Sequence, residues 1–298
     1  MLRFLVPGKG GQVGWELQTI LAPLGTVIGL DRNGMDLANP DSIRHAIRDA
    51  KPDVIVNAAA YNNVDRAESE SDLAMQVNGI APGIMAEEAK RLGAILIHYS
   101  TDYVFDGELE RPYREDDAPN PVNAYGRSKL AGERAVEAVG GKYLILRTSW
   151  VYSARGSNFV LTVLRLAREK AELSMVNDQS GSPTWARALA QATVELLRKH
   201  SLISRHSGTY HLSAAGHTSR FELAKAIISI ARARSSRSND WATVKAIAST
   251  QYPLPARRPA SPVLSKGKIM QVFGLEMKTW EEQLSAFLSE LMRASSAG

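Results

Sequence analysis

The sequence contains no cysteine among its 298 residues. Disulfides, thiolate metal ligands and thiol nucleophiles are therefore excluded together, and any catalysis has to use oxygen and nitrogen groups. No apolar run is long enough to span a membrane. The short apolar stretch at the N-terminus is broken by Pro7, which argues against a signal peptide. We therefore expect a cytoplasmic protein with no membrane partner.

The positive charges form no basic tract. The formal net charge is +5, but the lysines and arginines are scattered and are not interleaved with aromatic residues, unlike a typical nucleic-acid-binding surface. A small polyanionic ligand explains the excess equally well, and a solvated surface with a slight basic excess explains it most simply. We expect no nucleic-acid partner. The histidines at 98, 211 and 217 lack the spacing of a metal site, so we assign no metal ligands.

Short apolar runs and amphipathic segments alternate through the first half of the chain. The runs are rich in Val, Ile and Leu and occupy residues 2–6, 27–30, 54–56, 95–100 and 143–146. Helical patterns lie between them, at residues 11–21, 41–50, 71–92 and 122–139. Continuous apolar strands are typical of a parallel sheet that is covered on both faces. We therefore predict an α/β fold with a Rossmann-like, doubly wound parallel sheet.

The regularity weakens after about Trp150. Helical patterns mix with polar loops there, and residues 231–240 are expected to form a helix end and an exposed loop. We predict a division at this point, with one domain at residues 1–150 and a smaller C-terminal lobe at residues 151–298. Segments of the lobe are expected to cross back to the first domain.

A glycine-rich turn lies between the first predicted strand and the first predicted helix. Gly8, Gly11 and Gly14 are spaced three residues apart, with Gln12 and Val13 between the last two. The early glycines allow a tight turn and the close approach of a pyrophosphate, while the last lets helix and strand pack closely. Backbone amides at the helix start then face the phosphates. The position predicts an NAD(P)-binding Rossmann domain, which leaves substrate binding mainly to the second lobe.

Two opposite charges end the second predicted strand. Asp31 occupies the usual place of an acid that accepts hydrogen bonds from the adenosine ribose. Arg32 follows it directly, and an arginine there can pair with a 2′-phosphate. The sequence therefore leaves NADH and NADPH open.

Tyr125 and Lys129 lie four residues apart in a predicted helix, so the phenol and the ammonium share one helix face. A nearby cation stabilises a phenolate and lets tyrosine exchange a proton closer to neutral pH. A Tyr-x-x-x-Lys match alone is weak evidence. However, Thr101 ends the fourth predicted strand, at the edge where open parallel sheets bind ligands. We therefore predict a catalytic group of Tyr125, Lys129 and Thr101.

This combination resembles the extended short-chain dehydrogenase/reductase superfamily. Longer segments narrow the resemblance to its dTDP-4-dehydrorhamnose reductases: GQVG at 11–14, PDVIVNAAAY at 52–61, STDYVFDG at 100–107, RTSWVY at 147–152, NDQSGSPT at 177–184 and PARRP at 255–259. The resemblance implies NAD(P)H-dependent reduction of the C4 ketone of dTDP-4-dehydro-β-L-rhamnose to dTDP-β-L-rhamnose. In that reaction Tyr125 would protonate the nascent alkoxide, Lys129 would tune Tyr125 and hold the nicotinamide ribose, and Thr101 would assist.

The resemblance also implies further site residues. The cofactor-lining positions would be Asp36, Leu37, Ala58, Ala59 and Ala60, and the sugar-contacting positions would be Asp102, Tyr103 and Trp150, with Val64 close to both ligands. Trp150 could instead pack only in the core, although its place at a strand end favours stacking on the sugar. Some family members bind Mg²⁺ at a dimer contact through glutamates, so a homodimer and a Mg²⁺ ion stay open without assigned ligands.

Two missing residue types argue against dehydratase and epimerase-reductase activity. Related dehydratases carry Thr-Asp-Glu after the fourth strand, because eliminating water needs an acid and a base on adjacent carbons. Here the third residue is Tyr103, and the missing cysteine removes the Cys–His pair of epimerase-reductases. Simple reduction remains.

Three questions stay open. Asn62 and Asn63 depart from the usual Tyr-Thr-Ala-Val-Asp pattern, so another 4-keto sugar nucleotide is an alternative substrate. A non-catalytic subunit is an alternative of another class, since reductase-like folds also serve as regulatory partners of methionine adenosyltransferase. Finally, Arg257 and Arg258 either clamp the substrate diphosphate or cap the surface.

Overall fold

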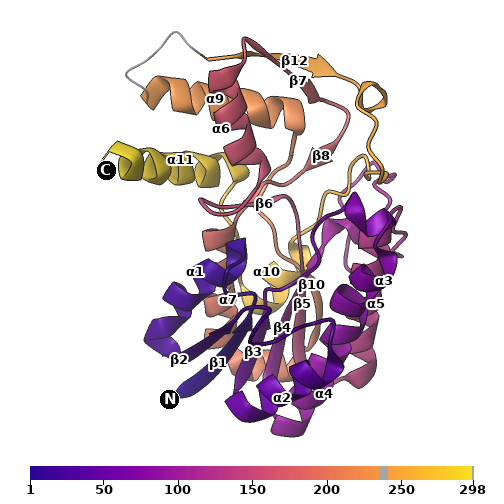
Figure 1. The fold of residues 1–298 in the computed structure, drawn as a ribbon. Coiled ribbons are helices and arrows are strands. Elements are labelled where there is room, and N and C mark those ends of the chain that lie inside the picture. The colour runs from indigo at the N-terminus through magenta and orange to yellow at the C-terminus, as the bar shows by residue number, and fades with distance from the viewer. Residues whose placement is uncertain (235–240, 297–298) are drawn as a thin grey trace.

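A wholly parallel sheet of six strands forms the centre of the structure, a computed structural model that describes residues 1–234 and 241–296 (Figure 1). The strand order is β10-β5-β4-β3-β1-β2. The strands are β1 (Leu2–Pro7), β2 (Gly25–Leu30), β3 (Val54–Asn57), β4 (Ile95–Thr101), β5 (Lys142–Thr148) and β10 (Gly208–His211). The predicted doubly wound parallel sheet is confirmed. The sequence did not predict β10, which joins the edge of the sheet beside β5.

Helices cover both faces of this sheet. One face packs on α1 (Gln12–Leu21), α7 (Ala186–Arg198), α8 (His200–Arg205) and α10 (Gly267–Phe273). The other packs on α2 (Pro40–Ala50), α4 (Ala81–Leu92) and α5 (Ala124–Val139). The expected helix at residues 71–92 is divided into α3 (Ser71–Ala74), a π-helical stretch (Met75–Ile80) and α4. Strand β4 is buried at every position because helices cover both faces of the sheet.

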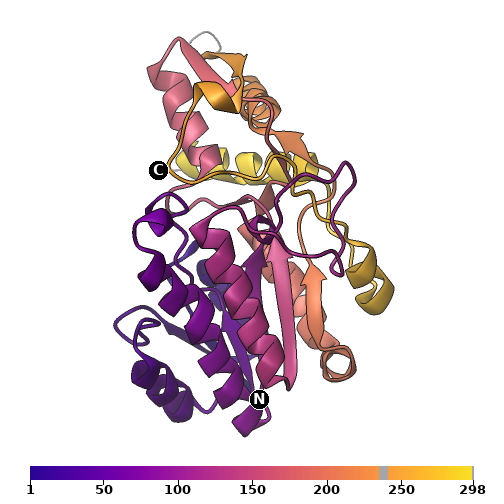
Figure 2. The same cartoon turned by 90° about the vertical axis from the view of Figure 1, so that its right-hand side faces the viewer.

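A second group of elements lies over one end of the sheet (Figures 1 and 2). It comprises α6 (Phe159–Glu169), β7 (Glu172–Val176), α9 (Arg220–Arg234), β12 (Thr243–Ile247) and α11 (Trp280–Ser296). These elements share a separate core around Tyr152, Leu173 and Phe287. Two short ladders join the region, β6 (Val151–Tyr152) with β9 (Thr184–Trp185) and β8 (Ser180–Gly181) with β11 (Thr218–Ser219).

The division at residue 150 stays a prediction. The elements α7, α8, β10 and α10 follow that point in the sequence but pack with the large sheet. The loop expected at residues 231–240 begins as the end of α9, and residues 235–240 lie outside the described residues. No described helix is long and apolar enough to cross a membrane.

Helix α1 contacts residues that connect it to the second group of elements. The guanidinium of Arg155 lies 3.3 Å from the ring centre of Trp15. Glu16, in the second turn of α1, accepts a hydrogen bond of 2.8 Å from Nε of Arg187. Arg187 belongs to α7 on the large sheet and also pairs with Glu290 of α11, so it links α1 to the second group.

A buried carboxylate fixes α5 to the sheet. Glu133 is 1% exposed and accepts hydrogen bonds from Ser100 on β4 and from Arg147 on β5. The shortest bond from the Arg147 guanidinium measures 2.6 Å, and Arg147 is itself only 3% exposed. Such a pair is costly to break from one side, because the remaining charge stays buried without a partner.

The substitution Glu133→Ala is therefore expected to lower the free energy of unfolding by about 3–5 kcal/mol, as breaking a buried ion pair does. Urea denaturation of the purified variant measures this loss. The matched control is Glu169→Gln, which breaks the exposed pair of Glu169 with Arg165 and should cost under about 1 kcal/mol. Equal losses in the two variants would contradict the assigned role of Glu133.

Candidate functional site

Two adjoining pockets run along the carboxyl ends of the strands. They share the wall formed by Gly10, Gly11, Ala58, Ala59, Ala60 and Asn62. The first extends toward the end of β2, and the second extends toward α5 and the second group of elements. Together they form a continuous cleft at the edge where a parallel sheet is expected to bind ligands.

The glycine-rich turn forms the floor where the pockets meet. Gly8 has a φ of +85°, and a Cβ at Gly14 would lie 2.1 Å from the Gly8 carbonyl oxygen. Gly11 precedes α1, and no side chain caps the first amides of that helix. Open space lies above Gly10, where an added Cβ meets nothing within 4 Å. The turn therefore fits the pyrophosphate of a dinucleotide, with free amides and the helix dipole directed at it.

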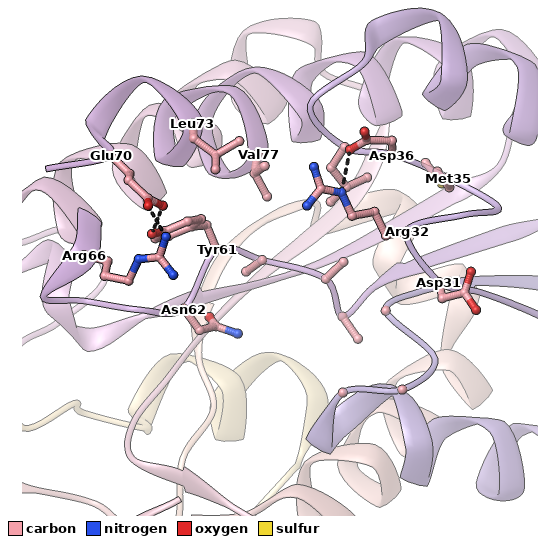
Figure 3. A pocket seen from close by; sticks show the side chains of 17 residues that line it. Asp31, Arg32, Met35, Asp36, Tyr61, Asn62, Arg66, Glu70, Leu73 and Val77 are labelled. Atoms are coloured by element: carbon pink, nitrogen blue, oxygen red, sulfur yellow. Dashed lines mark hydrogen bonds and ion pairs between the residues drawn. The ribbon is translucent and has the colours of Figure 1, made fainter. Parts of the chain in front are cut away.

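The charges at the end of β2 form pairs that the sequence did not reveal. Lys9 lies 3.1 Å from the Asp31 carboxylate and holds the pKa of that carboxyl below its ordinary value. Arg32 reaches Asp36 at 3.6 Å on one side of the first pocket (Figure 3). This end of the cleft therefore offers two carboxylates, which suit the hydroxyls of a ribose, and two cations, which suit a 2′-phosphate.

The opposite wall of the first pocket contains a cluster that sequence reasoning missed. The Tyr61 hydroxyl donates to Glu70 at 2.6 Å, and Glu70 also pairs with Arg66 (Figure 3). Leu73 and Val77 complete an apolar surface beside it. Since these residues follow β3 in a loop and two short helical segments, only the Arg66–Glu70 spacing of four was visible in the sequence.

Tyr125, Lys129 and Thr101 come together in the second pocket. Tyr125 and Lys129 lie on one face of α5, and a side-chain hydrogen bond joins Tyr125 to Thr101 at the end of β4. The Lys129 ammonium donates to the Tyr99 carbonyl at 2.7 Å. Burial raises the pKa of Tyr125, and burial lowers the pKa of Lys129 to about 8, with the charge of Glu133 opposing that change.

A second polar group lies beside this triad. Asp102 is 2% exposed and accepts hydrogen bonds from Ser149 at 2.6 Å and from Thr101 at 3.1 Å. Burial raises the pKa of Asp102 to about 6 despite these bonds. Tyr103 meets Tyr125 edge to face, with ring centres 5.8 Å apart. Thr101 thus donates its proton to Asp102, so donation to a substrate would require a ligand to replace that bond.

Trp150 lies at the junction of the two groups of elements. Its φ of +43° is uncommon for a residue with a side chain. Its indole lines the second pocket and occupies the space over Gly181, where an added Cβ would lie 2.3 Å from the ring. Trp150 also packs at the edge of the second core, whereas its stacking on a sugar stays a prediction.

The cleft gathers nearly all the predicted site residues. The first pocket is lined by Gly8, Asp31, Arg32, Asp36 and Leu37, and the second by Gln12, Val13, Val64, Thr101, Asp102, Tyr103, Tyr125, Lys129 and Trp150. Gly11, Ala58, Ala59 and Ala60 line both. Gly14 lines neither, because it packs against Gly8 beneath the turn.

The two candidate diphosphate clamps are engaged in ion pairs outside the lining of the two pockets. Arg258 makes a two-pronged contact with Asp65 at 2.8 and 2.9 Å and is little exposed. Arg257 is exposed and lies 3.5 Å from Glu108. Neither arginine lines the pockets described above. Within residues 1–234 and 241–296, no group of three or more His, Cys, Asp or Glu side chains could hold a metal ion.

Comparisons with known proteins cover almost the whole chain. A family model described as the RmlD substrate binding domain matches residues 2–293. The dTDP-4-dehydrorhamnose reductase of Burkholderia thailandensis is 46% identical over 296 residues, which cover 98% of this chain and 99% of the relative. The enzyme of that name from Escherichia coli K12 is 42% identical over 294 residues, covering 97% of this chain and 98% of the relative.

Solved structures agree with these matches. The Bacillus anthracis dTDP-4-dehydrorhamnose reductase, solved in complex with NADP, superposes with a TM-score of 0.90 at 36% identity and covers 97% of this chain and 99% of its own. A UDP-glucose 4-epimerase from Thermus thermophilus has a TM-score of 0.78 at 19% identity, covering 98% of this chain and 99% of its own, and shares the fold alone. This chain therefore belongs to the RmlD family, the family of the dTDP-4-dehydrorhamnose reductases.

Proposed function

We propose that the protein is an NAD(P)H-dependent reductase that converts dTDP-4-dehydro-β-L-rhamnose to dTDP-β-L-rhamnose. The observation that carries this proposal is the meeting of Tyr125, Lys129 and Thr101 in a pocket continuous with the glycine-rich turn. The names of the relatives support the substrate, and the NADP complex of the Bacillus anthracis relative supports the cofactor class. When bound, the nicotinamide supplies the hydride.

Tyr125 is the proposed proton donor to the oxygen of the substrate ketone. Burial raises its pKa, so the phenol is protonated at neutral pH but releases its proton less readily, and the transfer therefore needs a cation beside the phenolate. The phenolate that remains after transfer is stabilised by the ammonium of Lys129, one helical turn away. With a pKa of about 8, Lys129 is mostly charged at neutral pH.

The remaining proposed contacts follow from the same cleft. Asp102, Tyr103, Trp150 and Val64 would hold the sugar, and Asp102 would also orient the Thr101 hydroxyl, to which it is hydrogen-bonded. Residues of the first pocket would hold the adenosine part of the cofactor. There Asp31 suits the ribose of NADH and Arg32 suits the 2′-phosphate of NADPH, so both cofactors are proposed.

The proposal is tested by following cofactor oxidation with dTDP-, UDP- and GDP-linked 4-keto sugars. We expect the highest kcat/KM with dTDP-4-dehydro-β-L-rhamnose, because the relatives are named for this substrate. The ratio of the kcat/KM values measures the specificity. A higher kcat/KM with another ketosugar would assign another substrate to the same reductase. Absence of turnover with every nucleotide sugar would favour a binding subunit over an enzyme.

The substitution Tyr125→Phe removes the proton donor while keeping the ring. We expect kcat to fall by about 10²–10⁴-fold, the usual contribution of a general acid. The dissociation constant for NADPH, measured by fluorescence titration, should stay near that of the wild type. Tyr252→Phe is the matched control, because Tyr252 is 59% exposed. A Tyr125→Phe enzyme with the kcat of the control would refute the assignment.

The rate of reduction should depend on pH in both directions. Above about pH 8, Lys129 loses its proton and kcat/KM should fall, because the phenolate loses its cation. Below about pH 6, Asp102 takes up a proton and loses the negative charge that strengthens its bonds from Ser149 and Thr101, so kcat/KM should fall again. Asp102→Asn should remove the acidic limb only. A rate that is constant up to the ordinary lysine pKa of 10.5 would contradict the role of Lys129.

A further inference from the structure

An arginine from the second group of elements enters the second pocket. Arg220 is the first residue of α9, and it lines this pocket together with Asp102, Tyr103 and Trp150. Its position in the sequence gave no sign of this, since it lies more than sixty residues beyond the last predicted strand and outside every segment of the family resemblance. Its surroundings identify what it can bind.

Two aromatic rings fix the guanidinium of Arg220. Its central carbon lies 4.2 Å from the ring centre of Trp150 and 5.0 Å from that of Phe159. Trp150 is itself held in an uncommon backbone conformation with its indole packed over Gly181. Stacking of this kind orients a guanidinium by its flat faces and leaves the N–H groups at its edge free to donate.

No ion pair joins Arg220 to a carboxylate among the residues that the structure describes. Among the residues that the structure describes, its contacts are the two rings and a side-chain hydrogen bond with Tyr103. The charge of Arg220 acts to lower the pKa of Asp102, but the hydrogen bonds that the Asp102 oxygens accept come from Ser149 and Thr101. A stacked guanidinium with unused donors in a cleft is suited to a phosphate, which it can bind through two parallel hydrogen bonds.

We propose that Arg220 binds the diphosphate of the sugar nucleotide, an inference that rests on the proposed function. Tyr103 connects the two ends of this arrangement, because its ring meets that of Tyr125 and its side chain bonds to Arg220. In a 4-keto pyranose, the ketone at C4 and the diphosphate at C1 lie on opposite sides of the ring. A ketone placed at Tyr125 therefore directs the diphosphate across the sugar, past Tyr103 and toward Arg220.

This assignment separates the two phosphate-binding ends of the cleft. The glycine-rich turn offers backbone amides to the cofactor pyrophosphate, whereas Arg220 offers a side-chain cation to the substrate diphosphate. Arg257 and Arg258 are not needed as diphosphate ligands in this assignment, and their guanidinium groups pair with Glu108 and Asp65. In this proposal Arg220 takes the diphosphate-binding role for which Arg257 and Arg258 were the candidates in the sequence.

The test measures binding of dTDP to the complex of the protein with NADP⁺ by isothermal titration calorimetry. Arg220→Gln should raise the dissociation constant of dTDP by about tenfold or more, as loss of a charge-assisted hydrogen bond does. Arg220→Lys should fall between this variant and the wild type, because it keeps the charge but loses the planar fork. The matched control, Arg257→Gln, should bind dTDP as the wild type does.

Binding of NADPH and steady-state kinetics separate the possible failures. The proposal predicts a raised KM for the sugar nucleotide in Arg220→Gln and an unchanged dissociation constant for NADPH, which also shows that the variant is folded. Wild-type dTDP affinity in Arg220→Gln, or a loss of NADPH binding instead, would overturn the assignment while the wild type still reduces ketosugars. A wild type that neither binds dTDP nor reduces a ketosugar would overturn the proposed function together with it.

Discussion

The seating of α5 on the sheet, held by the buried carboxylate of Glu133, is the constraint on which the candidate site depends. Tyr125, Lys129 and Glu133 follow one another at intervals of four on the same helix, so fixing Glu133 to β4 and β5 also fixes the phenol and the ammonium. Gly126 and Gly132 let α5 pack closely on the turn after β4 and on the π-helical stretch, since an added Cβ would lie 2.2 Å from the Tyr103 carbonyl oxygen and 2.0 Å from that of Asn78.

Burial then gives the groups of the site their different proton affinities. It raises the pKa of Tyr125 and Asp102 and lowers that of Lys129, because water is excluded from each charged form. A protonated phenol, a carboxylate and an ammonium can therefore coexist at neutral pH within one pocket. The second group of elements completes the pocket with Trp150 and Arg220, whereas the cofactor end is built by the sheet and α1.

The parts of the fold and site that depend on local patterns were predictable from the sequence. The strands β1 to β5, the glycine-rich turn and the helical spacing of Tyr125 and Lys129 are local patterns of this kind. The parts that depend on contacts between distant segments were not predictable. Strand β10 pairs with β5 although more than fifty residues separate them in the sequence. Arg220 likewise stacks on Trp150, which lies far from it in the sequence. The partners of Arg257 and Arg258 were hidden for the same reason.

The central claim is that hydride reaches C4 of a dTDP-linked ketosugar while Tyr125 protonates the oxygen on that carbon. The most direct measurement uses NADPH carrying deuterium at the transferable position of the nicotinamide, with dTDP-4-dehydro-β-L-rhamnose as substrate. The account predicts a product with one deuterium, located at C4 of the sugar by NMR spectroscopy. Deuterium at another carbon, or a reduced product that contains none, would contradict it.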